Sequence, residues 1–195
     1  TSGASNLEEL RDRTKQKVLR RLKSEAIDLP DKIITPVYQH LSSRAYHAEM
    51  GNYRMWTREN KDSGLAMHLS KLMRVRQIIA DEKIELTSDL INQSLEQDKK
   101  VIVFTNFTDP LMQIHDKFKD ISVVLLNGSM KKEARQESVD RFQNDPNVKV
   151  FISNLKAGGV GITLTEAEVV IMSDLSFVPS EHAQAEDRAF RIGQK

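Results

Sequence analysis

Two arginines and a glutamine near the end of the chain have the types and spacing of a group that binds a polyanion. Gln184 is followed by Arg188 four residues later and by Arg191 three residues after that. On a helix that turns about 100° per residue, this spacing keeps the three side chains within about 60° of one another. Arginine suits phosphate oxygens because its charge is fixed and its donors form a planar fork. Surface ion pairs with Glu186 or Asp187 fit the same spacing, so two interpretations stay open.

A glycine-rich stretch, K-A-G-G-V-G at 156–161, precedes these residues and could also contact phosphate. Glycine permits positive φ and a close approach of the backbone to a ligand, and exposed N–H groups in such loops bind anions. A tight turn without a ligand explains the stretch equally well. The chain contains no Gly-Lys-Ser or Gly-Lys-Thr triplet. We therefore predict no Walker A cradle and expect phosphate contacts of another kind.

Four short apolar runs predict the sheet that would position these groups. These segments lie at 101–104, 121–126, 148–153 and 169–172. The run at 101–104 is continuously apolar, which is typical of a strand buried on both faces. Helical patterns separate the first three of them. This alternation predicts an α/β fold with a parallel sheet and helices on both faces.

Small polar residues follow all four predicted strands, at the edge where parallel sheets bind their ligands. Turns are polar for other reasons, so any one of these sites is equally compatible with an ordinary turn. The four together favour a binding edge. They are Thr105-Asn106, Asn127-Gly128-Ser129, Ser153-Asn154 and Ser173-Asp174.

Residues 1–98 predict a mainly helical region that approaches and braces a domain at 99–195. A helix at 6–24 carries seven Lys or Arg residues and one Asp between positions 11 and 23, which fits a solvated face, a phosphate contact or a brace. The segment 32–38 contains Pro36 and suggests an edge strand or a bend. The pattern from Ser42 to Gln97 is helical.

Composition excludes several classes of protein. The chain has 195 residues, a net charge of +1 and no cysteine, which excludes a disulfide scaffold and thiolate metal sites. Histidines lack ligand spacing, and Asp81-Glu82, although similar to a helicase magnesium box, continues a helical pattern. We therefore expect no metal site. No apolar run approaches the roughly 20 residues of a membrane span, so we expect no membrane partner.

Four longer stretches carry a resemblance to a known family. They are V-I-V-F-T-N-F from position 101, L-N-G-S-M-K-K-E-A-R-Q-E-S-V-D-R-F-Q from 126, I-S-N-L-K-A-G-G-V-G-I-T-L-T-E-A from 152, and Q-A-E-D-R-A-F-R-I-G-Q-K from 184. Together they resemble the C-terminal, RecA-like lobe of the Snf-type (SWI/SNF-related) DNA translocases, in helicase superfamily two. The first residues do not look like a natural start, and we expect a longer protein whose first lobe precedes this chain.

The resemblance implies a function as the second motor lobe of an ATP-dependent translocase. Its partners would be double-stranded DNA and the first RecA-like lobe of the same protein. ATP and Mg²⁺ would be bound mainly by that first lobe. This chain alone would then be inactive, and its location would be intracellular, cytoplasmic in a bacterium and nuclear in a eukaryote. Implied catalytic residues are Gln184, Arg188 and Arg191, with nucleotide contacts from Gly159, Gly161 and both arginines. Implied DNA contacts are Thr105, Asn106, Gly128, Ser129, Ser153, Asn154, Lys156 and Gly158.

Three positions depart from the family pattern. Phe177-Val178-Pro179 stands where Trp-Asn-Pro is common, Phe190 where histidine is frequent, and Thr163 where asparagine is frequent. Two other functions stay open at this point. One is the second lobe of an RNA or strand-separating helicase, and the other is a non-catalytic interaction domain with a RecA-like fold.

Overall fold

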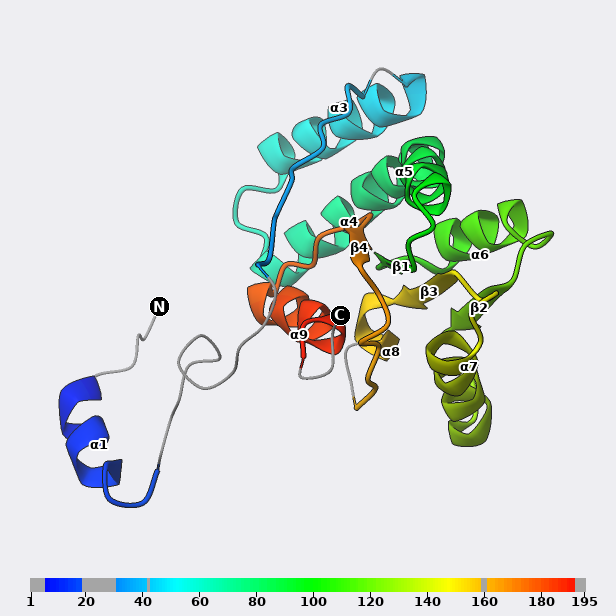
Figure 1. Cartoon of the computed structure of the whole chain (residues 1–195). Helices are drawn as coiled ribbons and strands as arrows, with labels where there is room; N and C mark the ends of the chain where they lie inside the picture. Colours follow the sequence, from blue (N-terminus) through cyan, green and yellow to red (C-terminus); the bar gives the residue numbers. More distant parts are fainter. Residues whose placement is uncertain (1–5, 19–30, 42, 159–160, 192–195) are drawn as a thin grey trace. The chain divides into compact units, whose positions relative to one another are not determined.

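The computed structural model of the chain describes residues 6–18, 31–41, 43–158 and 161–191 (Figure 1). The chain divides into two compact units, residues 1–30 and 31–195. This division does not coincide with the boundary predicted after residue 98. The helix Ile84–Glu96 lies before residue 98 and packs on the first and last strands of the sheet that follows it.

The described part of the first unit contains helix α1 (Leu7–Thr14). Acidic residues lie in its first turn and basic residues in its last, an order that stabilises the helix dipole. The helix predicted at 6–24 ends earlier than expected, and its part beyond residue 18 lies outside the described residues. None of the residues of α1 is buried.

The second unit is built around a parallel sheet with the strand order β2-β3-β1-β4. Every strand pairing is parallel, as the alternation of strands and helices predicted. The central strand β1 is buried along its whole length, which explains its continuous apolar sequence. The strands are β1 (Val101–Thr105), β2 (Val123–Leu126), β3 (Val150–Asn154) and β4 (Val169–Met172).

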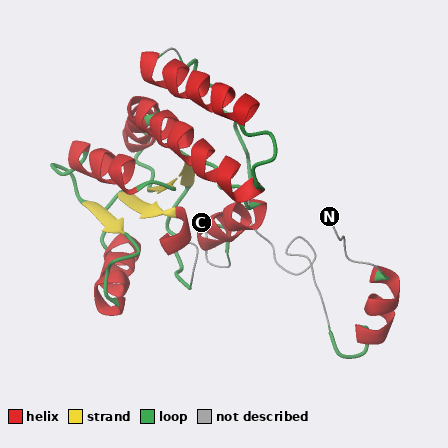
Figure 2. Cartoon of the chain, turned by 180° about the vertical axis from the view of Figure 1, so that it is seen from behind, coloured by secondary structure: helices red, strands yellow, loops and turns green. Residues whose placement is uncertain are grey.

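Helices cover both faces of this sheet (Figure 2), as predicted. Successive side chains of a strand point to opposite faces, so β1 contributes to two separate cores. Val101 and Val103 pack with residues of α5 and α6, whereas Ile102 and Phe104 pack with residues of α7, α8 and α9. The helices are α5 (Ile84–Glu96), α6 (Thr108–Lys117), α7 (Lys132–Asn144), α8 (Leu155–Gly158) and α9 (Pro179–Ala189).

Two further helices, α3 (Arg44–Glu59) and α4 (Leu65–Glu82), pack against each other before the sheet begins. The Ser43 hydroxyl caps α3 by accepting a hydrogen bond from the Tyr46 amide at 3.0 Å. Asp81 and Glu82 form the end of α4, which confirms that they continue a helix. No helix in the described ranges is long and apolar enough to cross a bilayer.

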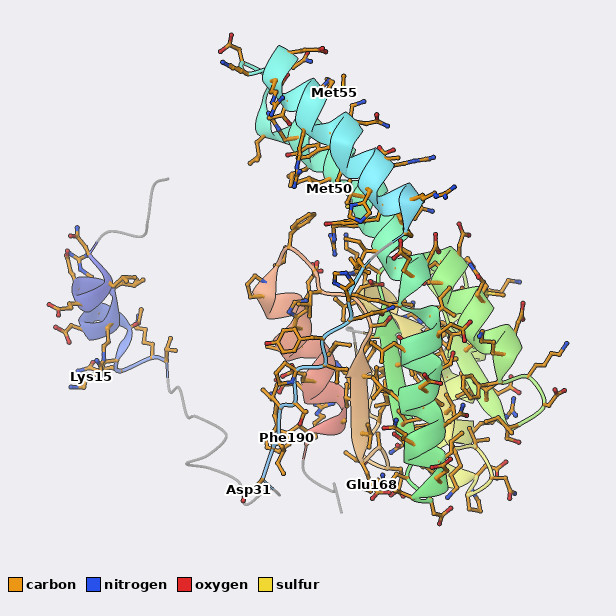
Figure 3. All side chains as sticks on the ribbon, turned by 90° about the horizontal axis from the view of Figure 1, so that it is seen from above. Lys15, Asp31, Met50, Met55, Glu168 and Phe190 are labelled. Atoms are coloured by element: carbon orange, nitrogen blue, oxygen red, sulfur yellow. The ribbon has the colours of Figure 1, made fainter. Side chains whose placement is uncertain are left out.

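Residues 31–41 form neither helix nor strand, so the edge strand considered at 32–38 is not formed. Proline at position 36 has no amide donor for a strand ladder. The start of the segment instead lies beside α9 (Figure 3), where the Lys32 ammonium pairs with Glu186. Farther along, Gln39 Nε2 donates to the Glu82 carbonyl at 3.0 Å.

Candidate functional site

The register of the sheet brings the ends of its strands to one edge. Thr105 of β1 lies opposite Asn154 of β3, and Leu126 of β2 lies opposite Ser153. Phe104 pairs with Met172 of β4, so the residues after these strands emerge at the same level. The carboxyl edge of a parallel sheet is where such folds bind ligands.

Thr105 and Asp174 join the ends of β1 and β4 at this edge. The Thr105 hydroxyl donates to Asp174 Oδ2 at 2.6 Å, and the Asn106 amide donates to the same oxygen at 3.2 Å. Thr105 is fully buried, so its hydroxyl fixes the edge from within. Among the described residues, Asn106 Nδ2 is a buried side-chain donor without a hydrogen-bond partner. It is a candidate donor to an anion if the edge opens.

Residues 127–129 form an exposed turn at the end of β2. Asn127 Oδ1 accepts hydrogen bonds from the Ser129 amide at 3.1 Å and from the Ser129 hydroxyl at 2.8 Å. Such an Asx turn is a common use of asparagine after a strand. Gly128 and Ser129 are exposed, so their backbone groups are accessible to a ligand.

Ser153 and Gly158 lie inside the protein. Ser153 is fully buried, and its hydroxyl donates to the Asn154 carbonyl at 3.0 Å. A Cβ atom at Gly158 would lie 2.5 Å from Phe104 Cε1 and 2.7 Å from Ser153 Oγ. Glycine is therefore required at 158 by the packing of α8 on the sheet.

The accessible part of the glycine-rich stretch lies on either side of this packed glycine. Lys156 and Gly161 are exposed, and Gly161 has a φ of 71°, which favours glycine. Gly159 lies outside the described residues. Arg135 Nη2 of α7 donates to the Ala157 carbonyl at 2.7 Å and so holds the end of α8. Sequence reasoning missed this role, although Arg135 lies within a motif of the resemblance.

The predicted single helix for Gln184, Arg188 and Arg191 is wrong for the last residue. Helix α9 ends at Ala189, and Phe190 has a non-helical ψ of 75°. Gln184 and Arg188 therefore share a helix, whereas Arg191 follows it (Figure 3, where Phe190 is labelled). The i, i+7 spacing could predict a common face only if the helix continued.

Tertiary contacts nevertheless bring both arginines to the segment after the glycine-rich stretch. Arg191 Nη1 donates to the Thr163 hydroxyl at 3.1 Å, and Arg188 Nη1 lies 3.5 Å from the Ile162 carbonyl it faces. The Leu164 amide donates to the Arg188 carbonyl at 2.9 Å. Residues 162–164 and the two arginines thus form one group, which we call the arginine site.

The arginine site is cationic and partly dehydrated. Burial lowers the pKa of Arg188 and the neighbouring charge of Arg191 lowers it further, while Asp187 partly opposes the shift. Burial and the charge of Arg191 both disfavour the charged form of Arg188. An anion bound here would offset the repulsion between the two guanidinium groups. The side chain of Gln184 is exposed, and the backbone carbonyl of Gln184 accepts a hydrogen bond from Arg188 Nε at 3.1 Å.

Neither a metal cluster nor the recess on α7 includes a predicted site residue among those that the structure describes. The described residues contain no group of three His, Cys, Asp or Glu side chains that could hold a metal ion. A shallow recess of about 930 Å³ lies along α7 and includes Lys132, Glu137 and Asp140, but none of the residues predicted for the site. The exposed residues Gly128, Lys156 and Gly161 make this edge accessible to an extended ligand or a second domain.

Comparison with known proteins identifies the family to which this chain is similar. The family described as helicase conserved C-terminal domain matches residues 82–193, more than half of the chain. An uncharacterized ATP-dependent helicase of Mycoplasma pneumoniae is 32% identical over 203 residues, covering 95% of this chain and 20% of the relative. The human DNA annealing helicase and endonuclease ZRANB3 is 31% identical over 202 residues, covering 98% of this chain and 18% of that protein.

Among solved structures, the SWI2/SNF2 ATPase core of Sulfolobus solfataricus in complex with dsDNA is similar to this chain. The TM-score is 0.68 at 32% identity, and the match covers 96% of this chain and 44% of that one. The α/β, RecA-like fold and the resemblance to the Snf-type C-terminal lobe are confirmed. The chain spans about a fifth or less of the length of the curated relatives it matches.

Proposed function

Because this chain belongs to the family of the helicase conserved C-terminal domain, we propose that it is the second motor lobe of an ATP-dependent translocase on double-stranded DNA. In this proposal, ATP binds mainly to a first RecA-like lobe of the same protein. The second lobe supplies arginines to the phosphates and contacts the DNA backbone. Turnover requires both lobes, and the location is intracellular.

The observation that carries the proposal is the arginine site. Arg188 and Arg191 lie together, 3.5 Å and 3.1 Å from their acceptors in residues 162–163. An arginine that stabilises the charge developing on a transferred phosphoryl group raises the rate by about 10³- to 10⁵-fold. Two arginines brought to one glycine-flanked segment therefore fit a γ-phosphate presented by another lobe. A surface ion pair would not require both of them to approach the same segment.

In the proposed mechanism, closure and opening of the two lobes move the arginines toward ATP and away from it. Closure of the lobes brings the guanidinium groups of Arg188 and Arg191 to ATP, where they neutralise charge as the bond to the γ-phosphate breaks. In this proposal, Mg²⁺ is held together with ATP mainly by the first lobe. Opening withdraws the arginines and releases the products.

DNA contacts are proposed along the carboxyl edge of the sheet. The exposed groups there are Gly128, Ser129 and Lys156, and Asn106 has a spare donor. Asn154 lies half-buried beside them. Thr105, Ser153 and Gly158 are buried, so their contribution would be to hold the edge in shape. Contacts of this kind address phosphates and carry no base sequence information.

The test uses the complete protein that contains this lobe. Arg191→Ala is expected to lower DNA-stimulated ATP hydrolysis by about 10³-fold or more, since an arginine finger contributes that much, while ATP and DNA binding persist. Arg141→Ala, which changes an exposed arginine on α7, is the matched control. Turnover within about tenfold of the unmodified protein would exclude the assigned role of Arg191. Stimulation by RNA in preference to duplex DNA would favour the helicase alternative.

A further inference from the structure

The side chain of Arg76 on α4 reaches the middle of the connection between β4 and α9. Its Nη2 donates a hydrogen bond to the Leu175 carbonyl. The guanidinium carbon of Arg76 also lies 4.2 Å from the centroid of the Phe177 ring, a distance at which a cation is attracted to an aromatic face. Two different groups of the same loop are therefore held by one guanidinium.

The same guanidinium lies near the end of β1 as well. Its carbon is 5.9 Å from the centroid of the Phe107 ring, and Phe107 is the N-cap residue of α6. A planar guanidinium can stack on rings and donate in its own plane at once, which a lysine cannot do. Arg76 thus joins α4, the end of β1 and the loop before α9.

Neighbouring contacts hold the start of this loop against α4 and α5. Lys83 Nζ donates to the Ser173 carbonyl at 3.1 Å. The hydroxyls of Thr87 and Ser173 are 3.0 Å apart and form a buried hydrogen bond. The next residue, Asp174, is held by the Thr105 hydroxyl and the Asn106 amide. Beyond Asp174, the direction of the loop depends on the contacts farther along, where Arg76 acts.

The loop is in turn tied to the first turns of α9. The Ser176 amide donates to His182 Nε2 at 2.6 Å, and the Ser176 hydroxyl donates to Glu181. The Val178 amide donates back to the Ser176 hydroxyl at 3.1 Å. A shift of residues 175–177 would therefore move α9, whose far end carries Arg188.

We propose that Arg76 is a positioning residue for the arginine site. It holds the loop 175–178, and through this loop it sets where α9 places Arg188 and where Arg191 follows. Phe177 is then the aromatic partner of Arg76, which assigns a role to one position that departs from the family pattern. The proposal has a structural consequence, which is the position of the loop and α9, and a catalytic consequence, which is the rate of ATP hydrolysis. The catalytic consequence rests on the proposed function, whereas the structural consequence does not.

The structural consequence is tested by hydrogen exchange on this chain. In Arg76→Ala, the amides of Ser176, Val178 and the first turn of α9 are expected to exchange faster, while those of β1 and β3 keep their protection. Arg74→Ala is the matched control, because Arg74 is an exposed arginine two residues away on the same helix. Unchanged exchange in the loop and α9 of Arg76→Ala would overturn the proposal.

The catalytic consequence is tested in the complete protein. A misplacement of about 1 Å can cost about 10²-fold in rate, so Arg76→Ala is expected to lower kcat by at least about tenfold while KM for ATP stays within about twofold. Phe177→Leu removes the ring face and should have the same kind of effect. Phe177→Trp keeps a face that attracts cations and should retain turnover, while Arg76→Lys should recover only part of it.

The outcomes separate this inference from the proposed function. If the unmodified complete protein hydrolyses no ATP, the proposed function fails, and hydrogen exchange alone decides whether Arg76 holds the loop and α9. Faster exchange together with a lower kcat supports the positioning role. Faster exchange with an unchanged kcat shows that Arg76 only stabilises the fold, and it overturns the role.

Discussion

Arg191 donates a hydrogen bond to the hydroxyl of Thr163 at 3.1 Å, across 28 residues of sequence. This bond links an arginine that lies beyond the end of α9 to the segment that follows the glycine-rich stretch. It also assigns a partner to Thr163, which stands where the family often has asparagine. The bond is exposed, so its main consequence should be the position of Arg191 and not the stability of the fold.

Thr163→Val removes the hydroxyl that accepts from Arg191 and keeps the shape of the side chain. A hydrogen bond of this kind stabilises a protein by only about 0.5–1.5 kcal/mol, so thermal unfolding should change little. ATP hydrolysis by the complete protein should fall, because Arg191 would no longer be held near residues 162–164. Thr163→Ser keeps the acceptor and should retain turnover. Equal turnover in Thr163→Val and the unmodified protein would show that this bond does not position Arg191.

Gly158→Ala should destabilise the second unit. The added methyl group would lie 2.5 Å from Phe104 Cε1 and 2.7 Å from Ser153 Oγ, and overpacking of this kind costs about 1–3 kcal/mol. Gly51→Ala is the control, since nothing lies within 4 Å of its Cβ position, and alanine favours a helix interior by about 1 kcal/mol. Urea unfolding of both variants should therefore shift in opposite directions. A midpoint for Gly158→Ala at or above that of the parent would contradict the packing argument.

Thr105→Val should loosen the join between the ends of β1 and β4. The substitution keeps the volume of the side chain but removes the buried donor to Asp174 Oδ2. Asp174 Oδ2 keeps the Asn106 amide as a donor, so the variant loses one hydrogen bond, which should cost about 0.5–1.5 kcal/mol and can be measured by chemical denaturation. Thr105→Ser preserves the hydroxyl and should lie between the two. If Thr105→Val is as stable as the parent, the Asp174 carboxylate finds an equivalent donor elsewhere.

The pH dependence of stability should include a contribution from Asp81. Burial raises the pKa of this carboxyl above its ordinary value of 3.8, and the charges of Asp109 and Asp174 raise it further. The folded state then binds a proton more tightly than the unfolded state, so this group makes the fold less stable as pH rises through its folded pKa. Asp81→Asn should stabilise the chain at neutral pH, with no gain below the unfolded pKa. The effect should be small, because the side chain is exposed to screening solvent.

This chain by itself should show no appreciable ATP hydrolysis, with or without duplex DNA. Its arginines would contact a nucleotide held by another lobe, and the sequence contains no Walker A triplet. A coupled assay of phosphate release, with the complete protein as the positive control, measures this directly. Robust DNA-stimulated turnover by the chain alone would disprove the division of labour between the lobes.

The sheet and its helices were predictable because their signals are local. The apolar run at 101–104 needs burial on both faces, and β1 has it. A helix near Glu181–Arg191 was also predicted, but the observed helix ends at Ala189, so the predicted orientation of Arg191 was wrong. Hydrophobic periodicity does not show where a helix ends if the next residue is also apolar and partly buried. Phe190, which follows α9 and is half-buried, is such a residue.

Predictions for the strand ends were correct in position but did not distinguish accessible groups from buried ones. Thr105 is the last residue of β1 and Gly128 follows β2, yet Thr105 is buried and Gly128 is exposed. Thr105 ends a strand that has neighbours on both sides, and its hydroxyl donates a hydrogen bond to Asp174, which follows β4. A pairwise contact of this kind leaves no periodic trace in either segment.

The sequence alone determined the order of the four strands and of helices α6, α7 and α9, the polar edge at the strand ends, and the family resemblance, whereas it missed the short helix α8. These features follow from local periodicity and from motifs that are continuous in the chain. Only the tertiary structure decided that Arg191 meets Thr163, that Thr105 is bound by Asp174, and that Arg76 holds the loop before α9. These contacts join residues 28, 69 and 99 positions apart. They depend on how helices pack on the sheet, because a hydrogen bond forms only where packing brings the two groups within about 3 Å.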